Sequence, residues 1–289
     1  NTIQNAMTSH VMRIWQAYLG VISNNIISGS SIEDKTGRHA LKLHGPGYSS
    51  FDNAREYGPP AVGTALLEHR TEFAVVSDNV FGSSGPWPVM MAPQDGFTDS
   101  LLSDIIFERN RIITNYGKKS PRDVSVALHI AARNATVRNN IFNGTGSGSD
   151  YTAIEILNEG RQPAPQGVEV YNNTIYRSDN TAGNGRYGII IRKTARQTIV
   201  KNNLIVFPGP KVPIVAINNS SSDLIEQNNL LTGTPGFIDP DNRDPLKANF
   251  NLRPGSPAIN AGAVVPVHED IDNNARPDGN YDIGAHERK

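Results

Sequence analysis

The feature that most constrains the fold is a short pattern that returns along the chain: an apolar run, an asparagine, and one or two more apolar residues. The asparagines of this pattern are Asn1, Asn25, Asn79, Asn110, Asn140, Asn173, Asn203 and Asn229. Their spacings lie between 24 (25 − 1) and 33 (173 − 140), apart from one of 54 (79 − 25) that contains a long insertion. A repeat of this length with an apolar pattern indicates stacked structural units.

Each repeat contains three strand-like runs, one well before the asparagine, one leading into it and a short one after it. The runs are rich in Val and Ile and are separated by Gly, Asn, Ser and Pro, which is typical of short strands. A single repeat cannot bury its apolar face, so equivalent strands of neighbouring repeats must pair in parallel. We therefore predict an all-β solenoid, a coil of three parallel sheets.

The repeated asparagines are interpreted as structural. We expect each at the tight bend between the second and third strands, because Asn tolerates the left-handed backbone region. Stacked about 4.8 Å apart, their amides can donate and accept along a ladder.

This pattern resembles the right-handed parallel β-helix proteins, of which polysaccharide lyases and related secreted bacterial carbohydrate-active proteins are best known. The resemblance covers residues 1–235 and implies about seven rungs with an asparagine ladder. The series GFIDP, NFNLRPGSPAINAG and DIDNNARPDGNYDIGAHE is similar to the C-terminal segment of many secreted bacterial β-helix repeat proteins. Residues 236–289 are therefore expected to wrap the coil as a C-terminal cap of the same domain.

Composition narrows the class of partner. The net charge of −1 and the absence of a phosphate-binding glycine motif argue against nucleic acid. The chain has no cysteine, and no apolar run reaches the ~18 residues of a membrane span. Asn1 falls inside a rung, so we expect that an N-terminal part of the coil precedes it. The expected protein is a secreted monomer, extracellular or periplasmic, with a polysaccharide as its partner.

The outward face of the first strands is the candidate site. Strand alternation predicts a central outward column of Arg13, Lys42, Met91, His129, Glu155, Ile190 and Ala216. Ionisable side chains fill four of its first five positions. Lys42 and His129 would be two rungs apart, roughly 9–10 Å, which is the width of a sugar subsite.

These residues suit removal of the proton α to the carboxylate of a uronic acid, which requires a base and cations that stabilise enolate-like charge. Lys42 is the preferred base, because Arg13 and His44 crowd it, and His129 is the second choice. Arg13 and Arg192 are candidate carboxylate clamps, and Glu155 would orient His129 or contact a sugar hydroxyl.

Further residues are candidates for substrate binding. Trp15 and His44 would form a flat platform beside the column. The long insertion at 45–71 contributes Tyr48, Arg55 and Tyr57, which could close over a substrate.

Any one of these side chains could equally belong to a solvated strand face, so the hypothesis of a functional site rests on their clustering. The clustered residues indicate a β-eliminating polysaccharide lyase or a related epimerase acting on an acidic polysaccharide. The first alternative is a non-catalytic carbohydrate-binding or cell-surface β-helix. The second is a glycoside hydrolase that would pair Glu155 with Asp123, Asp150 or Glu159, although spacing fixes no such pair. His10 and His39, each just before a first strand, are expected to stack in the turn.

The C-terminal acidic stretch is the remaining candidate for a ligand. It contains Asp270, Asp272, Asn274, Asp278 and Asp282. It lacks the glycine and terminal glutamate of an EF-hand, and Arg276 within it suggests internal ion pairs. We favour a structural cap, with bound Ca²⁺ as the alternative. The candidate site itself includes no metal ligand, and no other cofactor is identified.

Overall fold

The computed structural model describes residues 1–4, 10–15, 17–29, 39–45, 70–82, 87–93, 101–113, 124–144, 150–158, 160, 162–178, 187–192, 194–207, 215–218, 223–277 and 279–289. For residues 70, 124, 125, 150 and 215–218 it describes the backbone alone.

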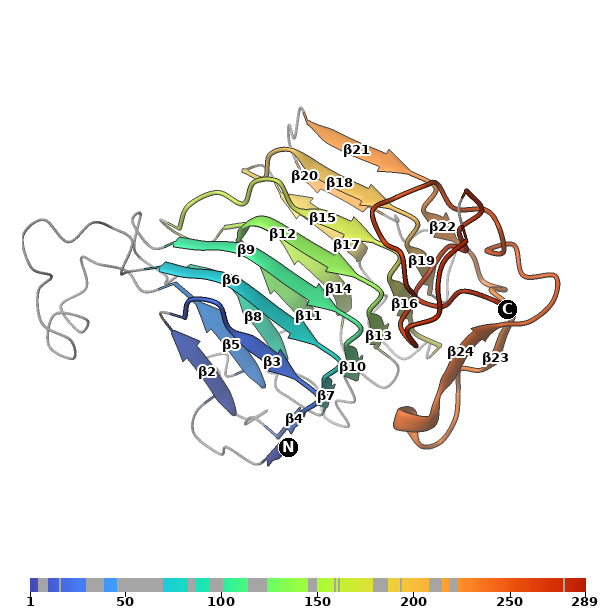
Figure 1. Cartoon of the computed structure of the whole chain (residues 1–289), viewed down its shortest axis with the longest axis horizontal. Coiled ribbons are helices and arrows are strands. Elements are labelled where there is room, and N and C mark those ends of the chain that lie inside the picture. Colours follow the sequence, from blue (N-terminus) through green and yellow to red (C-terminus); the bar gives the residue numbers. More distant parts are fainter. Residues whose placement is uncertain are drawn as a thin grey trace, which may run out of the picture.

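The chain coils through three sheets in which every neighbouring pair of strands is parallel (Figure 1). The first-strand sheet contains β2 (Met12–Trp15), β5 (Leu41–His44), β8 (Val89–Met91), β11 (Val124–Ile130), β14 (Asp150–Ile156), β17 (Tyr187–Arg192) and β20 (Val215–Asn218). The second-strand sheet contains β3 (Val21–Ser23), β6 (Arg70–Ser77), β9 (Leu101–Glu108), β12 (Arg133–Arg138), β15 (Glu169–Tyr171), β18 (Thr198–Lys201) and β21 (Leu224–Gln227). The third-strand sheet contains β1 (Thr2–Gln4), β4 (Ile26–Ser28), β7 (Val80–Gly82), β10 (Arg111–Ile113), β13 (Ile141–Asn143), β16 (Thr174–Tyr176), β19 (Leu204–Val206) and β22 (Leu230–Leu231). The predicted all-β parallel β-helix is confirmed.

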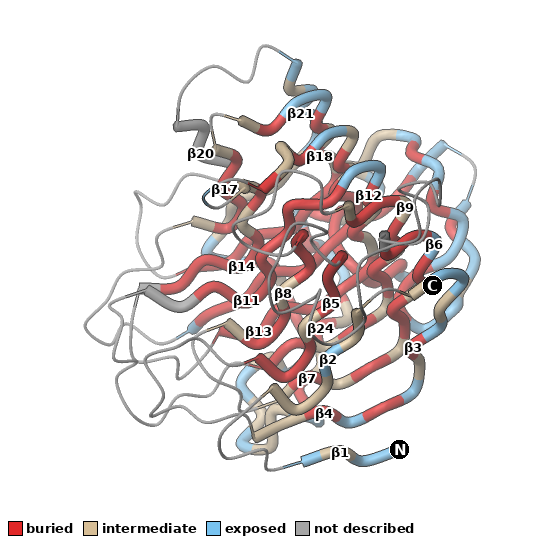
Figure 2. The backbone as a smooth tube through the Cα atoms, turned by 90° about the vertical axis from the view of Figure 1, so that its left-hand side faces the viewer, coloured by how far each residue is buried: buried red, intermediate tan, exposed pale blue. Residues whose placement is uncertain are grey.

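The core lies between the three sheets, where the buried residues of the strands gather (Figure 2). In the third-strand sheet, one inward row is fully buried and consists of Ile27, Phe81, Ile112, Phe142, Ile175 and Ile205. Phe81 also stacks on Phe107 of the second-strand sheet, with ring centroids 6.0 Å apart. Burying a side chain of this size stabilises the fold by about 1.5–3 kcal/mol. The stacked apolar rows therefore hold neighbouring rungs together.

The predicted asparagine ladder is confirmed along its whole length. Each ladder asparagine donates Nδ2 to Oδ1 of the equivalent asparagine in the next repeat, from Asn1 through Asn229. These distances run from 2.8 Å between Asn203 and Asn229 to 3.2 Å between Asn1 and Asn25. In the interior of the row the amides are almost fully buried, so the ladder satisfies polar groups that have no access to water.

The prediction that the ladder asparagine itself adopts the left-handed conformation is wrong. The residue before it does so, at φ between 50° and 58°, in Asn24, Asp78, Arg109, Asn139, Asn172, Asn202 and Asn228. Four ladder asparagines, Asn25, Asn79, Asn140 and Asn203, also donate Nδ2 to the carbonyl two residues earlier, at 2.9–3.0 Å. In these repeats the bond closes the bend around the residue with positive φ.

The C-terminal segment packs along this bend, beside β16, β19 and β22 (Figure 1). It contains the antiparallel pair β23 (Phe237–Asp239) and β24 (Asn249–Leu252), with the 3-10 turn η2 (Pro245–Lys247) between them. Four left-handed asparagines donate Nδ2 to its backbone carbonyls at 2.7–2.9 Å: Asn139 to Glu269, Asn172 to Asp282, Asn202 to Ala263 and Asn228 to Ala261. The contacts extend over four successive repeats, and the domain division at 235/236 stays a proposal.

Arg276 anchors this segment from inside. Its fully buried guanidinium lies 2.7 Å from Glu287 and donates to Asn139 Oδ1 at 3.0 Å and to Gly284 O at 2.9 Å. Burial lowers the pKa of Arg276 and raises that of Glu287, so it opposes the charge on both partners. The hydrogen bonds offset that cost. Arg276 therefore forms a buried ion pair as predicted, but with Glu287, which lies outside the acidic stretch from Asp270 to Asp282.

Candidate functional site

The central column of the first-strand sheet is set by strand register. Arg13 pairs with Lys42, Lys42 with Met90, Met90 with His129, and His129 with Glu155, followed by Ile190 and Ala216. The column thus contains Met90, and the prediction of Met91 is wrong by one residue. Val89 and Met91 are both fully buried. The run Val89–Met91 is apolar throughout, so no polar residue in it indicates which side chains point outward.

His129, Glu155 and Arg192 form one connected cluster. Glu155 Oε2 lies 3.3 Å from His129 Nδ1, and Glu155 Oε1 accepts from Arg192 Nε at 3.3 Å. Burial raises the pKa of Glu155, but the contacts with His129 and Arg192 outweigh it and lower the pKa below its usual value. Glu155 is therefore a carboxylate at neutral pH, as an orienting partner for His129 must be.

The carboxylate also determines how a neutral His129 ring is protonated. An ionised carboxylate only accepts hydrogen bonds, so Nδ1 must carry the proton that faces Glu155. Nε2 then keeps its lone pair, and it has no hydrogen-bond partner in the described parts of the chain. His129 is 3% exposed, so this lone pair is shielded from water. A positioned imidazole with a free basic nitrogen is suited to accept a proton.

Arg13, Trp15 and His44 form a second cluster at the N-terminal end of the column. Arg13 Nε donates to His44 Nε2 at 2.9 Å, and its guanidinium lies over the Trp15 ring, 5.1 Å from the centroid. The Trp15 and His44 rings are 5.5 Å apart. Burial, assisted by the charges of Lys42 and Arg13, lowers the pKa of His44 to about 3. His44 is thus a buried neutral acceptor, and the platform predicted from Trp15 and His44 is covered on its histidine side.

Lys42 lies between these clusters. It is half-buried, pairs in register with Arg13, and has Met90 between it and His129. Two strand spacings give roughly 9–10 Å between Lys42 and His129. The structure therefore places cations at one end of the column and the His129–Glu155 pair two rungs away.

Several candidates lie outside the described residues. They are Tyr48, Arg55 and Tyr57 of the insertion, Asp123, Glu159 and the side chain of Asp150. The loop closure and the paired-carboxylate alternative stay predictions.

The stacking predicted for His10 and His39 is confirmed. Their rings lie 4.9 Å apart and 2° from parallel, and His39 Nδ1 lies 2.6 Å from Trp87 O. Burial lowers the pKa of His39 to about 3, so this histidine is neutral and structural.

Sequence reasoning missed a polar row just beyond Arg192. Thr194 Oγ1 donates to Asn158 Oδ1, Asn158 Nδ2 donates to Gln162 O at 2.9 Å, and Gln162 Nε2 donates to Pro93 O at 2.9 Å. These residues follow strand ends and have no fixed spacing, so nothing in the local sequence singled them out. They border the Glu155–Arg192 end of the column.

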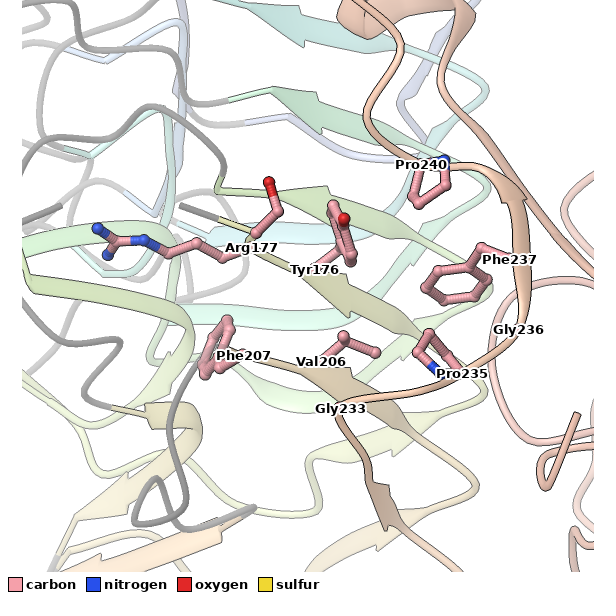
Figure 3. A pocket seen from close by; sticks show the side chains of 10 residues that line it. Tyr176, Arg177, Val206, Phe207, Gly233, Pro235, Gly236, Phe237 and Pro240 are labelled. Atoms are coloured by element: carbon pink, nitrogen blue, oxygen red, sulfur yellow. The ribbon is translucent and has the colours of Figure 1, made fainter. Parts of the chain in front are cut away.

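A cavity of about 420 Å³ lies elsewhere, between the third-strand sheet and the C-terminal segment. Figure 3 shows Tyr176, Val206, Phe237 and Pro235 around it, with the Arg177 guanidinium directed away from Phe237. Its walls come from both parts, and the rings of Tyr176 and Phe237 pack on each other there with centroids 5.8 Å apart, so we assign it to their junction.

No helix in the described part of the chain is long and apolar enough to cross a membrane. The chain matches no protein-family model and no curated protein. It is similar in structure to the pectate lyase Pel9A, with 15% identity and a TM-score of 0.44 over 100% of this chain and 70% of that one. It is also similar to XylC in its complex with xylose, with 12% identity and a TM-score of 0.43 over 100% of this chain and 49% of that one.

Proposed function

We propose that this protein is a secreted β-eliminating enzyme that acts on an acidic polysaccharide through the outward face of the first-strand sheet. The observation that carries the proposal is the His129–Glu155 pair, with Nδ1 facing the carboxylate and Nε2 without a partner in the described residues. The cationic Arg13 and Lys42 lie in the same column and provide positive charge for a uronic acid carboxylate.

The chemical step follows from these positions. His129 Nε2 takes the proton from the carbon α to the substrate carboxylate, and the electron pair of that C–H bond forms a carbon–carbon double bond. The adjacent bond to the glycosidic oxygen breaks, and this oxygen takes a proton from Lys42 or from water. Cations near the carboxylate stabilise the enolate-like charge that develops on the way. Because Nε2 is covered in this structure, the proposal requires an opening above His129.

Lys42 remains the competing base, and the pH dependence of turnover in the variants separates the two. The chain is incubated with alginate, pectate and glycosaminoglycans, and turnover is measured as new absorbance from the unsaturated product. On an active substrate, His129→Ala and Lys42→Ala should each lower turnover by about 10²–10⁴ with the fold intact. Glu226→Gln, an exposed carboxylate on β21, is the control and should leave turnover unchanged. Loss at low pH that follows a histidine titration, and that disappears in His129→Ala, would assign the base to His129.

Absence of both new absorbance and new reducing ends on the whole panel would overturn the proposal. Saturable binding of a polysaccharide without product would then support the non-catalytic carbohydrate-binding alternative. Exchange of the α proton with solvent and inversion of configuration, without chain cleavage, would identify an epimerase instead.

A further inference from the structure

A second cluster of ionisable side chains lies far from the column, where the C-terminal segment meets β10. Asp270, Asp272 and His286 each place one possible ligand atom within 4.8 Å of the others. Arg111 of β10 lies beside the cluster, with Nη2 3.9 Å from Asp272 Oδ1. A cavity of about 300 Å³ opens against Arg111, Asp272, His286 and residues 246–251.

His286 is the observation that points to a ligand. Its side chain is 3% exposed, and its Nδ1 lies 3.2 Å from Asp272 Oδ2 in an ion-pair contact. Nε2 has no hydrogen-bond partner among the described residues. Two ligands held at 2.0–2.2 Å by one tetrahedral ion are about 3.4 Å apart, which is close to the separation of Nδ1 and Oδ2. A buried imidazole left in this state indicates a partner other than the protein.

Asp270 holds the turn that carries Asp272. It is fully buried, and its oxygens accept from four neutral N–H groups: those of Asp272, Asn274 and Glu287 in the backbone and the Asn274 side-chain amide. These four N–H groups fill the acceptor positions of both oxygens, so Asp270 is satisfied by the protein itself. They hold the turn at 270–274, and with it Asp272, in a fixed position.

We propose that Asp272 and His286 bind a divalent transition-metal ion such as Zn²⁺, and that Asp270 positions the turn that carries Asp272. The imidazole selects against Ca²⁺, which takes six to eight oxygen ligands. Asp272 is half-exposed and can move toward the ion, and Arg111 on its outer oxygen keeps Oδ2 toward His286. The cavity leaves room for water at the remaining coordination positions. The ion would join the turn at 270–274 to the tail at 286 and fix the C-terminal segment beside β10.

Calorimetric titration of the chelator-treated full chain with ZnCl₂ tests the site, with CaCl₂ titrated separately. We expect a single Zn²⁺ per chain, weakened in Asp272→Asn and in His286→Gln by at least the roughly 10–100-fold that loss of an outer-shell contact costs. His268→Ala, an exposed histidine of the same segment, and Asp223→Asn, an exposed carboxylate elsewhere, are matched controls and should bind as the wild type does. Zn²⁺ should also raise the Tm of the wild type and of both controls, but not of the two site variants.

Three results would overturn the proposal: no saturable binding, binding that survives both site variants, or binding lost in His268→Ala. Equal affinity for Ca²⁺ would overturn the choice of ion. If His286→Gln does not fold, as judged by circular dichroism, the half-exposed Asp272→Asn decides the test.

Discussion

Replacing one amide in the middle of the asparagine ladder tests whether this row holds the coil together. Asn140 is fully buried, and its side chain makes five hydrogen bonds, two accepted and three donated. Oδ1 accepts from the backbone N–H and the amide of Asn110 at 2.9 and 3.1 Å. Nδ2 donates to Phe107 O, Arg138 O and Asn173 Oδ1 at 2.9–3.0 Å.

Asn140→Ala removes these bonds where water cannot replace them. The amide of Asn110 keeps a bond to Val76 O, but the Asn110 backbone N–H and the Phe107 carbonyl lose this partner. Each buried group left unsatisfied costs about 1–3 kcal/mol, so the free energy of unfolding should fall by about 2–6 kcal/mol. Asn140→Asp keeps the acceptor but directs a buried carboxylate at three oxygen atoms, so at neutral pH it should cost at least as much.

Urea denaturation followed by circular dichroism measures both variants, and an unchanged m-value establishes that the unfolding transitions are comparable. Asn229→Ala is the matched control, because this amide makes the equivalent bonds at the half-buried end of the row: it accepts from the backbone N–H and the amide of Asn203 and donates to Val200 O. Its surroundings are only partly buried, so the cost should be smaller, about 1 kcal/mol. The reasoning is refuted if Asn140→Ala costs no more than Asn229→Ala.

Three further changes test other parts of the structure. His39 and His44, with pKa values of about 3 when folded and about 6.5 when unfolded, bind fewer protons in the folded state. Their contribution to the free energy of unfolding is complete above pH 6.5 and is lost as the pH falls toward 3, by up to about 1.4 kcal/mol per pH unit for each histidine. The free energy of unfolding of His44→Gln should therefore depend less steeply on pH than that of the wild type. Arg276→Ala should cost about 3–5 kcal/mol in urea denaturation, because Glu287 is left as a buried charge, and a cost below about 1 kcal/mol would contradict this. Leu19→Gly, at φ 56° and 69% exposed, should raise the Tm by removing left-handed strain, whereas Val21→Gly, exposed in a strand, should lower it; equal shifts would disprove the strain.

The fold could be predicted from the sequence because every rung is built from the same pattern of strands and the same asparagine. One strand pattern and one asparagine, repeated with nearly constant spacing, determine which strands pair and in what register, so errors in single repeats do not propagate. The prediction that Met91 points outward was wrong because the run Val89–Met91 contains no polar residue that indicates the outward side. The pairing of Met90 with His129 in the next strand identifies Met90 as the outward residue, but this pairing is seen only in the folded coil.

The candidate site was only partly accessible, because burial depends on neighbours that the local sequence does not specify. Alternation predicted that Lys42, His129 and Glu155 share a face, and their register agrees with it. It could not predict that His44 is buried against Arg13 and Trp15 of the preceding rung. His44 is therefore a neutral hydrogen-bond acceptor for Arg13 and not an exposed surface for a sugar ring. Contacts between rungs therefore decide which outward residues remain available to a substrate.

The ladder explains only the second asparagine of each doubled pair, and the first one has a different role. In the pairs Asn139–Asn140, Asn172–Asn173, Asn202–Asn203 and Asn228–Asn229, the second residue belongs to the ladder and the first holds the C-terminal segment. In two earlier repeats the first position is Asp78 or Arg109, and these pair with each other at 2.9 Å. Asn is the residue that both tolerates positive φ and donates to a backbone carbonyl, so a doublet is favoured where a second chain segment must be held. The run of doublets from Asn139 to Asn229 lies along the side of the coil that the C-terminal segment covers. A single doublet does not mark that side, because Asn24–Asn25 also occurs at a repeat where no bond to the C-terminal segment is seen among the described residues.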